Sequence, residues 1–135
     1  QEFNSLFEKL VDINNLTNKK IKIKSREINF TKCSANVAHC TFDFICNNNL
    51  AHDDYAKIAK EFNLIFIENV PKMTTDYSDQ CRRFISLIDM LYDSNCSVVI
   101  LAENPISSLC QITNLAKEFE RTASRLYELT IIQPK

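Results

Sequence analysis

The chain contains no glycine among its 135 residues, although average usage would place roughly nine in a chain of this length. A Walker A loop needs glycines so that its backbone amides can wrap around a phosphate. A Rossmann turn needs them for close approach to a pyrophosphate. The sequence therefore excludes both phosphate-binding loops within these residues. Because asparagine tolerates left-handed backbone better than other non-glycine residues, the Asn-rich stretches 12–18 and 46–50 are expected to supply such turns.

An excess of charge of one sign and long apolar runs are also missing. The 16 basic and 17 acidic side chains leave a net charge of −1, which gives no electrostatic case for binding nucleic acid or an anionic membrane. No apolar run approaches the roughly 18 residues that a membrane span requires. The first ten residues are acidic and amphipathic, unlike a signal peptide. Because the chain begins with Gln1 and not with Met, we expect it to be processed or taken from a longer polypeptide.

The six cysteines show no C-x-x-C spacing, and only two histidines accompany them. Structural zinc sites draw on closely spaced cysteines and histidines, so the sequence predicts no metal site. We expect the cysteines to be small buried or half-buried thiols of a reducing compartment, and not a disulfide framework.

Hydrophobic periodicity divides the chain into helices and strands. Helical spacing predicts four helices, over 2–13, within 47–62, over 78–94 and over 115–129. Alternation of apolar and polar residues predicts half-buried strands at 20–24, 25–30 and 40–46. Continuous apolar runs predict two further strands, at 63–68 and 97–102, and such runs are typical of a parallel sheet that is buried on both faces.

The second half of the chain therefore has the order helix, strand, helix, strand, helix. This order favours right-handed crossovers and a parallel strand pair. The first half adds short antiparallel strands, and no linker divides the two halves. The predicted fold is a single α/β domain, in which a mixed sheet with a parallel strand pair is flanked by helices.

The two predicted parallel strands end in similar sequences, NLIFIENVP (63–71) and SVVILAENP (97–105). Their acids, Glu68 and Glu103, would lie at the carboxyl ends of the strands, where α/β proteins place ligands. If the strands are neighbours, the two carboxylates could serve a metal-dependent hydrolase; the alternative is a pair of solvated strand ends. Residues 52–54, His-Asp-Asp, precede a helix and are expected to cap it.

Four arginines are stronger candidates for contacts with a nucleotide or a partner protein. Arg82 and Arg83 open the helix predicted at 78–94, where they could reach a phosphate or a partner's carboxylate, or could form a solvated, self-paired face. Arg121 and Arg125 lie four residues apart on the last helix, and like charges at that spacing are mildly unfavourable. The pair therefore indicates partners outside the helix, either acids of another element or an anion. An ion ladder within the helix is the alternative.

Four stretches, in order, carry a resemblance to a known family: DDYAKIAKEFNLIFIENVP (53–71), DQCRRFISLIDMLYD (79–93), LAENP (101–105) and FERTASRLYE (119–128). They resemble the C-terminal part of the ZapE family of AAA+-type ATPases, which includes the mitochondrial LACE-type ATPases. The resemblance covers roughly residues 20–129. The Walker A and Walker B segments of that family lie N-terminal to this region and are not present here. Residues 1–135 are therefore identified as a C-terminal domain, a fragment of a ZapE-like ATPase that follows a P-loop core.

The resemblance implies a function that couples ATP binding and hydrolysis to the handling of protein partners, in cell division or in the quality control of membrane proteins. It implies ATP and Mg²⁺ as cofactors of the full-length protein and none for this chain alone, which would be inactive by itself. The implied partners are the N-terminal P-loop ATPase core, division or membrane-associated proteins and further copies of the chain, but not nucleic acid. The implied location is the bacterial cytoplasm, with the mitochondrial matrix as the alternative.

Within such an ATPase, arginines of this domain would neutralise charge that develops on the transferred phosphoryl group. Arg121 and Arg125 are the first candidates for this role, and Arg82 and Arg83 are the second. A different function remains open beside it, because the chain could be a stand-alone or remnant protein-interaction module with no nucleotide activity.

Overall fold

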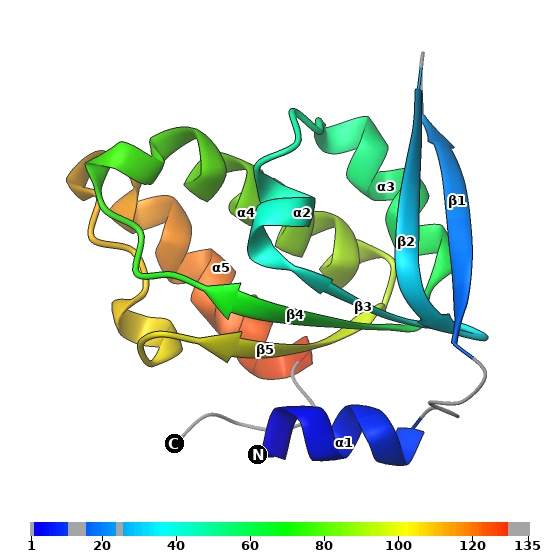
Figure 1. Cartoon of the computed structure of the whole chain (residues 1–135). Coiled ribbons are helices and arrows are strands. Elements are labelled where there is room, and N and C mark those ends of the chain that lie inside the picture. Colours follow the sequence, from blue (N-terminus) through cyan, green and yellow to red (C-terminus); the bar gives the residue numbers. More distant parts are fainter. Residues whose placement is uncertain (1, 11–15, 24–25, 130–135) are drawn as a thin grey trace.

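A five-stranded mixed sheet is the centre of the computed structural model, which describes residues 2–10, 16–23 and 26–129 (Figure 1). The strands follow one another across the sheet in chain order: β1 Thr17–Ile23, β2 Arg26–Ser34, β3 Val37–Thr41, β4 Leu64–Val70 and β5 Ser97–Ala102. The first three strands pair antiparallel, whereas β3, β4 and β5 run parallel. The prediction of a single α/β domain with a mixed sheet is confirmed.

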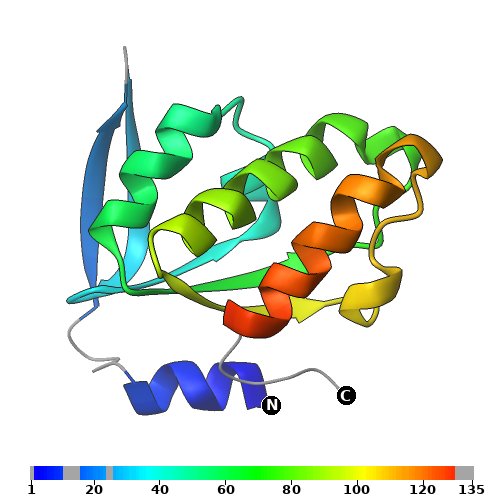
Figure 2. The same cartoon turned by 180° about the vertical axis from the view of Figure 1, so that it is seen from behind.

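Helices cover both faces of the sheet, but unequally (Figures 1 and 2). The helices are α1 Glu2–Leu10, α2 Phe42–Cys46, α3 His52–Glu61, α4 Ser78–Asp93 and α5 Ala116–Leu129. Short 3₁₀ turns, η2 Thr75–Tyr77, η3 Ile106–Ser108 and η4 Thr113–Leu115, lie in the connections. Helices α2 to α5 lie on one face, with α4 between α3 and α5, and α1 lies alone on the other (Figure 2).

The core is divided by the sheet into two apolar clusters. The larger cluster lies under α2 to α5 and includes Phe84, Leu87 and Leu91 of α4, which are fully buried as their helical spacing predicts. In the smaller cluster, Phe3 and Phe7 of α1 pack edge-on against Phe66 of β4. The central strand β4 therefore contributes side chains to both clusters, which explains its continuous apolar run.

The predicted strand at 40–46 is wrong, because strand β3 ends at Thr41 and helix α2 follows at once. The Thr41 side chain accepts a hydrogen bond from the Phe44 backbone N–H, 3.1 Å away, and so caps the new helix. Phe42, Ile45 and Cys46 are buried at helical spacing. The alternation of Phe42 and Phe44 that indicated a strand concealed this second pattern.

The other predicted elements are confirmed with small shifts at their ends. Strand β5 and helix α4 match their predicted ranges to within one residue, whereas β1 and β2 are longer than predicted. The predicted helix 2–13 is observed as α1, and residues 11–13 lie outside the described residues. Within the described residues, no helix is long and apolar enough to span a membrane.

Asparagine takes most of the left-handed backbone positions that glycine would otherwise occupy. Asn49, Asn69 and Asn95 have φ values of 52°, 60° and 55°. Asn49 confirms the prediction for stretch 46–50, whereas most of stretch 12–18 lies outside the described residues. Ala35 is the fourth described residue with positive φ, at 53°, in the two-residue turn between β2 and β3.

Replacing Ala35 with glycine should stabilise the chain. Left-handed backbone is unfavourable for alanine but not for glycine, and two-residue hairpin turns favour glycine at such positions. We expect Ala35→Gly to raise the free energy of unfolding by about 0.5–1 kcal/mol, measured by urea denaturation. The matched control Ala123→Gly, within helix α5, should lower it by about 1 kcal/mol. If both substitutions destabilise the chain equally, the turn does not strain Ala35.

Candidate functional site

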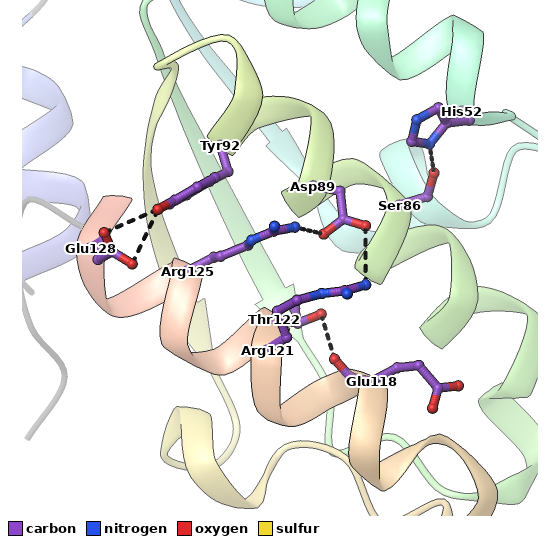
Figure 3. Close-up of polar contacts among 9 residues, drawn as sticks. All are labelled: His52, Ser86, Asp89, Tyr92, Glu118, Arg121, Thr122, Arg125 and Glu128. Carbon is purple, nitrogen blue, oxygen red and sulfur yellow. Dashed lines mark hydrogen bonds and ion pairs between the residues drawn. The ribbon is translucent and has the colours of Figure 1, made fainter.

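The arginine pair of helix α5 meets an acid on the neighbouring helix α4 (Figure 3). Arg125 donates a hydrogen bond from Nη1 to Asp89 Oδ1, and Arg121 Nη2 lies 4.0 Å from Asp89 Oδ2. The prediction that this pair requires a partner outside its own helix is therefore confirmed, and the partner is an acid of another element. The alternative, an ion ladder within α5, is not the arrangement among the described residues.

The two arginines differ in how they are held. Arg125 is 25% exposed and its partner Asp89 is 20% exposed, so this ion pair is largely shielded from water. Arg121 is 60% exposed and contacts the same carboxylate only at long range. Since Arg125 already neutralises Asp89, the charge of Arg121 remains available at the surface.

Two further side chains of α4 and α5 fix the position of Arg125. Its guanidinium carbon lies 4.8 Å from the centre of the Tyr92 ring, a cation–π contact. The Tyr92 hydroxyl in turn donates to the Glu128 carboxylate, with oxygen distances of 3.2 and 3.4 Å. These contacts make Arg125 a residue that joins the two helices. No pattern in the sequence identified Asp89 as the acid that the α5 arginines would contact.

The two adjacent arginines at the start of α4 have different surroundings. Arg83 donates to the Cys46 carbonyl and to the Asn49 side-chain oxygen, both at 3.1 Å, so it caps the end of α2 and holds the loop after it. Arg82 is exposed and forms no hydrogen bond or ion pair within the described residues. Arg83 therefore has a structural position, whereas Arg82 remains a surface charge.

The two strand-end acids also lie in different surroundings, although their strands β4 and β5 are neighbours as the hypothesis required. Glu68 faces His39 on strand β3, with 3.9 Å between Oε2 and Nε2. Glu103 accepts a hydrogen bond from the Lys72 backbone N–H at 2.7 Å. Within the described residues, no group of three or more His, Cys, Asp or Glu side chains could hold a metal ion.

His39 lines a small pocket that the sequence did not predict. The pocket, of about 220 Å³, is lined by His39 and Glu68 and by Asn29 and Lys32 of strand β2, among others. Burial lowers the pKa of His39, although the nearby Glu68 carboxylate opposes that shift. The Asn29 side-chain oxygen is buried and has no hydrogen-bond partner among the described residues. Nothing in the spacing of these residues indicated that three adjacent strands would bring them together.

Residues 52–54 form the first turn of helix α3, and Asp54 has the capping role that the sequence predicts for this stretch. Asp54 Oδ2 accepts a hydrogen bond from the Ala51 backbone N–H at 2.8 Å, as in a capping box. His52 Nδ1 lies 2.8 Å from Ser86 Oγ and so joins α3 to α4 (Figure 3). These contacts position the helix layer that carries the arginines.

Comparison with known proteins decides the family. The model of the AFG1-like ATPase family matches residues 1–133. The chain belongs to the AFG1-like ATPase family. The resemblance to ZapE and LACE-type proteins is thereby confirmed, because relatives with those names also match. No solved structure matches the chain.

Three relatives of this AFG1-like chain cover much of its length. Lactation elevated protein 1 homolog B of Danio rerio is 34% identical over 128 residues, which is 93% of this chain and 25% of the relative. Cell division protein ZapE of Escherichia coli is 33% identical over 89 residues, 66% of this chain and 24% of the relative. An uncharacterized protein of Schizosaccharomyces pombe is 29% identical over 90 residues, 67% of this chain and 20% of the relative. The chain thus spans about a quarter of the length of the curated relatives that it matches.

Removing the charge of Asp89 should destabilise the AFG1-like chain. The substitution Asp89→Asn leaves the half-buried Arg125 without its carboxylate, and we expect a loss of about 1–2 kcal/mol in the free energy of unfolding. Asp93→Asn removes the same charge from an exposed position at the end of α4 and should change it by less than about 0.5 kcal/mol. Urea denaturation of both variants measures the difference, and equal losses would contradict the importance of the pair.

The buried His39 should make stability depend on pH in a defined direction. Because its pKa is lowered in the folded chain, the unfolded chain takes up a proton at a higher pH, near 6.5, than the folded chain does. The stabilising contribution is therefore complete above that pH and is lost as the pH falls. Between about pH 7.5 and 5.5, His39→Gln should lose less stability on acidification than the parent chain or His52→Gln, as urea denaturation at each pH would measure. A parallel loss in all three chains would contradict this.

Proposed function

We propose that this chain is the part of an AFG1-like ATPase that follows the phosphate-binding core, and that it presents Arg121 to nucleotide held by that core. The absence of glycine from these residues supports a division of labour, because another segment must then supply the phosphate loop. The match to the AFG1-like family supports ATP and Mg²⁺ as the cofactors of the whole protein.

The difference in exposure between the two arginines carries the proposal. Arg125 is held by Asp89 and by the Tyr92 ring, so it has a positioning role. Arg121 projects from the same helix and is 60% exposed. Its Nη2 atom lies 4.0 Å from the Asp89 carboxylate, at the outer limit of an ion pair. An exposed guanidinium on a helix that is held in place by its neighbours suits contact with an anion.

An arginine in this position would act on charge and would not make or break a covalent bond itself. During phosphoryl transfer, negative charge is spread over the oxygens of the transferred group, and an arginine stabilises that charge. The N-terminal core would hold ATP and Mg²⁺, which supply the phosphoryl group and its main counter-charge. The nucleotide could belong to the same subunit or to a neighbouring copy in a homo-oligomer.

We further propose that ATP hydrolysis is coupled to the handling of protein partners. One relative is named a cell division protein, which supports a role in bacterial cell division, in the cytoplasm. The alternative is a role with membrane-associated proteins in the mitochondrial matrix. A stand-alone interaction module without nucleotide activity is the competing function, and ATP turnover distinguishes it from the ATPase function.

The substitution Arg121→Ala should reduce ATP turnover in the polypeptide that joins this chain to a P-loop core. We expect kcat to fall by about 100-fold or more, with a much smaller change in nucleotide affinity, since the arginine would act mainly on transition-state charge. Steady-state ATPase assays and nucleotide titrations measure the two quantities separately.

Lys117→Ala is the matched control, because it removes a positive charge from an exposed position one turn earlier on α5. This variant should retain kcat within about twofold of the parent, because it removes no proposed contact. Loss of turnover in Lys117→Ala, or normal turnover in Arg121→Ala, would contradict the role of Arg121. Absence of turnover in the parent polypeptide itself would favour the interaction module.

A further inference from the structure

Two of the six cysteines lie within contact distance of one another. Cys81, in the first turns of helix α4, directs its Sγ toward Cys110 Sγ at a distance of 3.9 Å. Cys110 lies on the connection between η3 and η4. The described residues show no other sulfur–sulfur contact of this kind, although all six thiols are free. Both thiols are buried or half-buried, as the sequence predicts, but no feature of the sequence indicated that these two would meet.

The backbone holds the two cysteines in place. Cys110 forms an isolated parallel bridge with Met73, which lies five residues before α4 begins. The Met73 N–H donates to the Leu109 carbonyl and the Gln111 N–H donates to the Met73 carbonyl, both at 2.7 Å. A disulfide needs a sulfur separation of about 2.05 Å, so side-chain rotation must bring the two atoms closer by just under 2 Å.

We propose that Cys81 and Cys110 form a reversible disulfide and that the pair is an oxidative modification site for small hydroperoxides. The pair combines a short separation, an anchored backbone and unequal access to solvent. This inference concerns thiol chemistry alone and does not depend on the proposed ATPase function.

The unequal surroundings of the two thiols assign their roles. Cys81 is fully buried, and burial, together with the adjacent Cys110, raises its pKa to about 12, so it remains a protonated thiol. Cys110 is half-buried and lines an open pocket of about 570 Å³ beside Phe119, Ala123 and Tyr127 of α5. An oxidant therefore reaches Cys110 first, and Cys81 is the resolving thiol.

The reaction proceeds in two balanced steps. The Cys110 sulfur attacks one oxygen of the hydroperoxide, the O–O bond breaks, and the other oxygen leaves as water or an alcohol with the thiol proton of Cys110, while Cys110 becomes a sulfenic acid. The Cys81 sulfur then displaces the hydroxyl of that sulfenic acid, which leaves as water with the thiol proton of Cys81. Both sulfurs are oxidised by one electron each and one hydroperoxide is reduced. A dithiol reductant reverses the change.

The new bond would join the start of α4 to the segment that leads into α5. It closes a loop from residue 81 to residue 110 that contains most of α4 and all of β5. Cross-links of this loop size restrict the unfolded chain, so oxidation should raise the thermal midpoint by on the order of 10 °C.

The test is to oxidise the reduced native chain with hydrogen peroxide, block the remaining thiols with an alkylating reagent and map linked peptides by mass spectrometry. Trypsin places Cys81 in peptide 73–82, and Cys110 in peptide 84–117 together with Cys96. Fragment ions that join Cys81 to Cys110, formed about tenfold or more faster in native than in urea-unfolded protein, are the expected result.

Matched variants separate the two cysteines of the long peptide. The Cys96→Ser variant should retain the cross-link, because Cys96 is almost fully buried and its thiol donates to the Ser97 carbonyl at 3.7 Å, away from the Cys81–Cys110 contact. The Cys110→Ser variant should lose it while keeping the thermal midpoint of the reduced parent within a few degrees. A native cross-link through Cys96, no cross-link in the parent, or sulfinic acid on Cys110 without a disulfide would overturn the proposal.

Discussion

The carboxylate of Asp89 is the point on which the arrangement of helices α4 and α5 depends. It lies between two arginines of α5 but forms a close hydrogen-bonded ion pair only with Arg125. The Tyr92 ring and the Tyr92–Glu128 hydrogen bond complete the contact, so α4 contributes a carboxylate and an aromatic ring, whereas α5 contributes only charged side chains. An exposed ion pair stabilises a protein little by itself. Both side chains of this pair are at least three-quarters buried, and a hydrogen bond from Arg125 to Asp89 fixes their geometry. The Asp89–Arg125 pair therefore fixes the orientation of α5 against α4, and with it the position of the exposed Arg121.

That remaining charge connects the fold to the proposed function. A chain with no glycine cannot build a phosphate cradle from its own backbone, so any part that it plays in phosphoryl chemistry must come through side chains. Arg121 meets this condition, since Arg125 joins its helix to α4 and Phe119 and Leu126 of the same helix are buried in the larger apolar cluster. Membership in the AFG1-like family supplies the context in which such a side chain would meet nucleotide. Two arginines of α5 thus have different roles: Arg125 positions the helix, and Arg121 is the residue that we propose to contact nucleotide.

Sequence patterns predicted the fold well where one periodicity dominated and failed where two overlapped. The stripe of α4 and the continuous apolar strands β4 and β5 left no ambiguity, because burial on one side or on both sides produces distinct patterns. Residues 42–46 satisfied both alternation and helical spacing, and the Thr41 cap decided the outcome. For the site, the like-charged pair Arg121 and Arg125 predicted a partner outside the helix, either an acid or an anion, and only the packing of α4 against α5 could identify it as Asp89. The pocket around His39 was not predictable, because it depends on the register of three strands.

The most direct test of this account is a pair of double-mutant cycles on the free energy of unfolding, one for Asp89 with Arg125 and one for Asp89 with Arg121. The account predicts a coupling energy of about 1–2 kcal/mol for the first pair, because it is close and largely buried. It predicts less than about 0.5 kcal/mol for the second pair, because Arg121 is exposed and distant. Equal coupling energies would mean that the two arginines share the carboxylate, and Arg121 would then not be left available for a nucleotide.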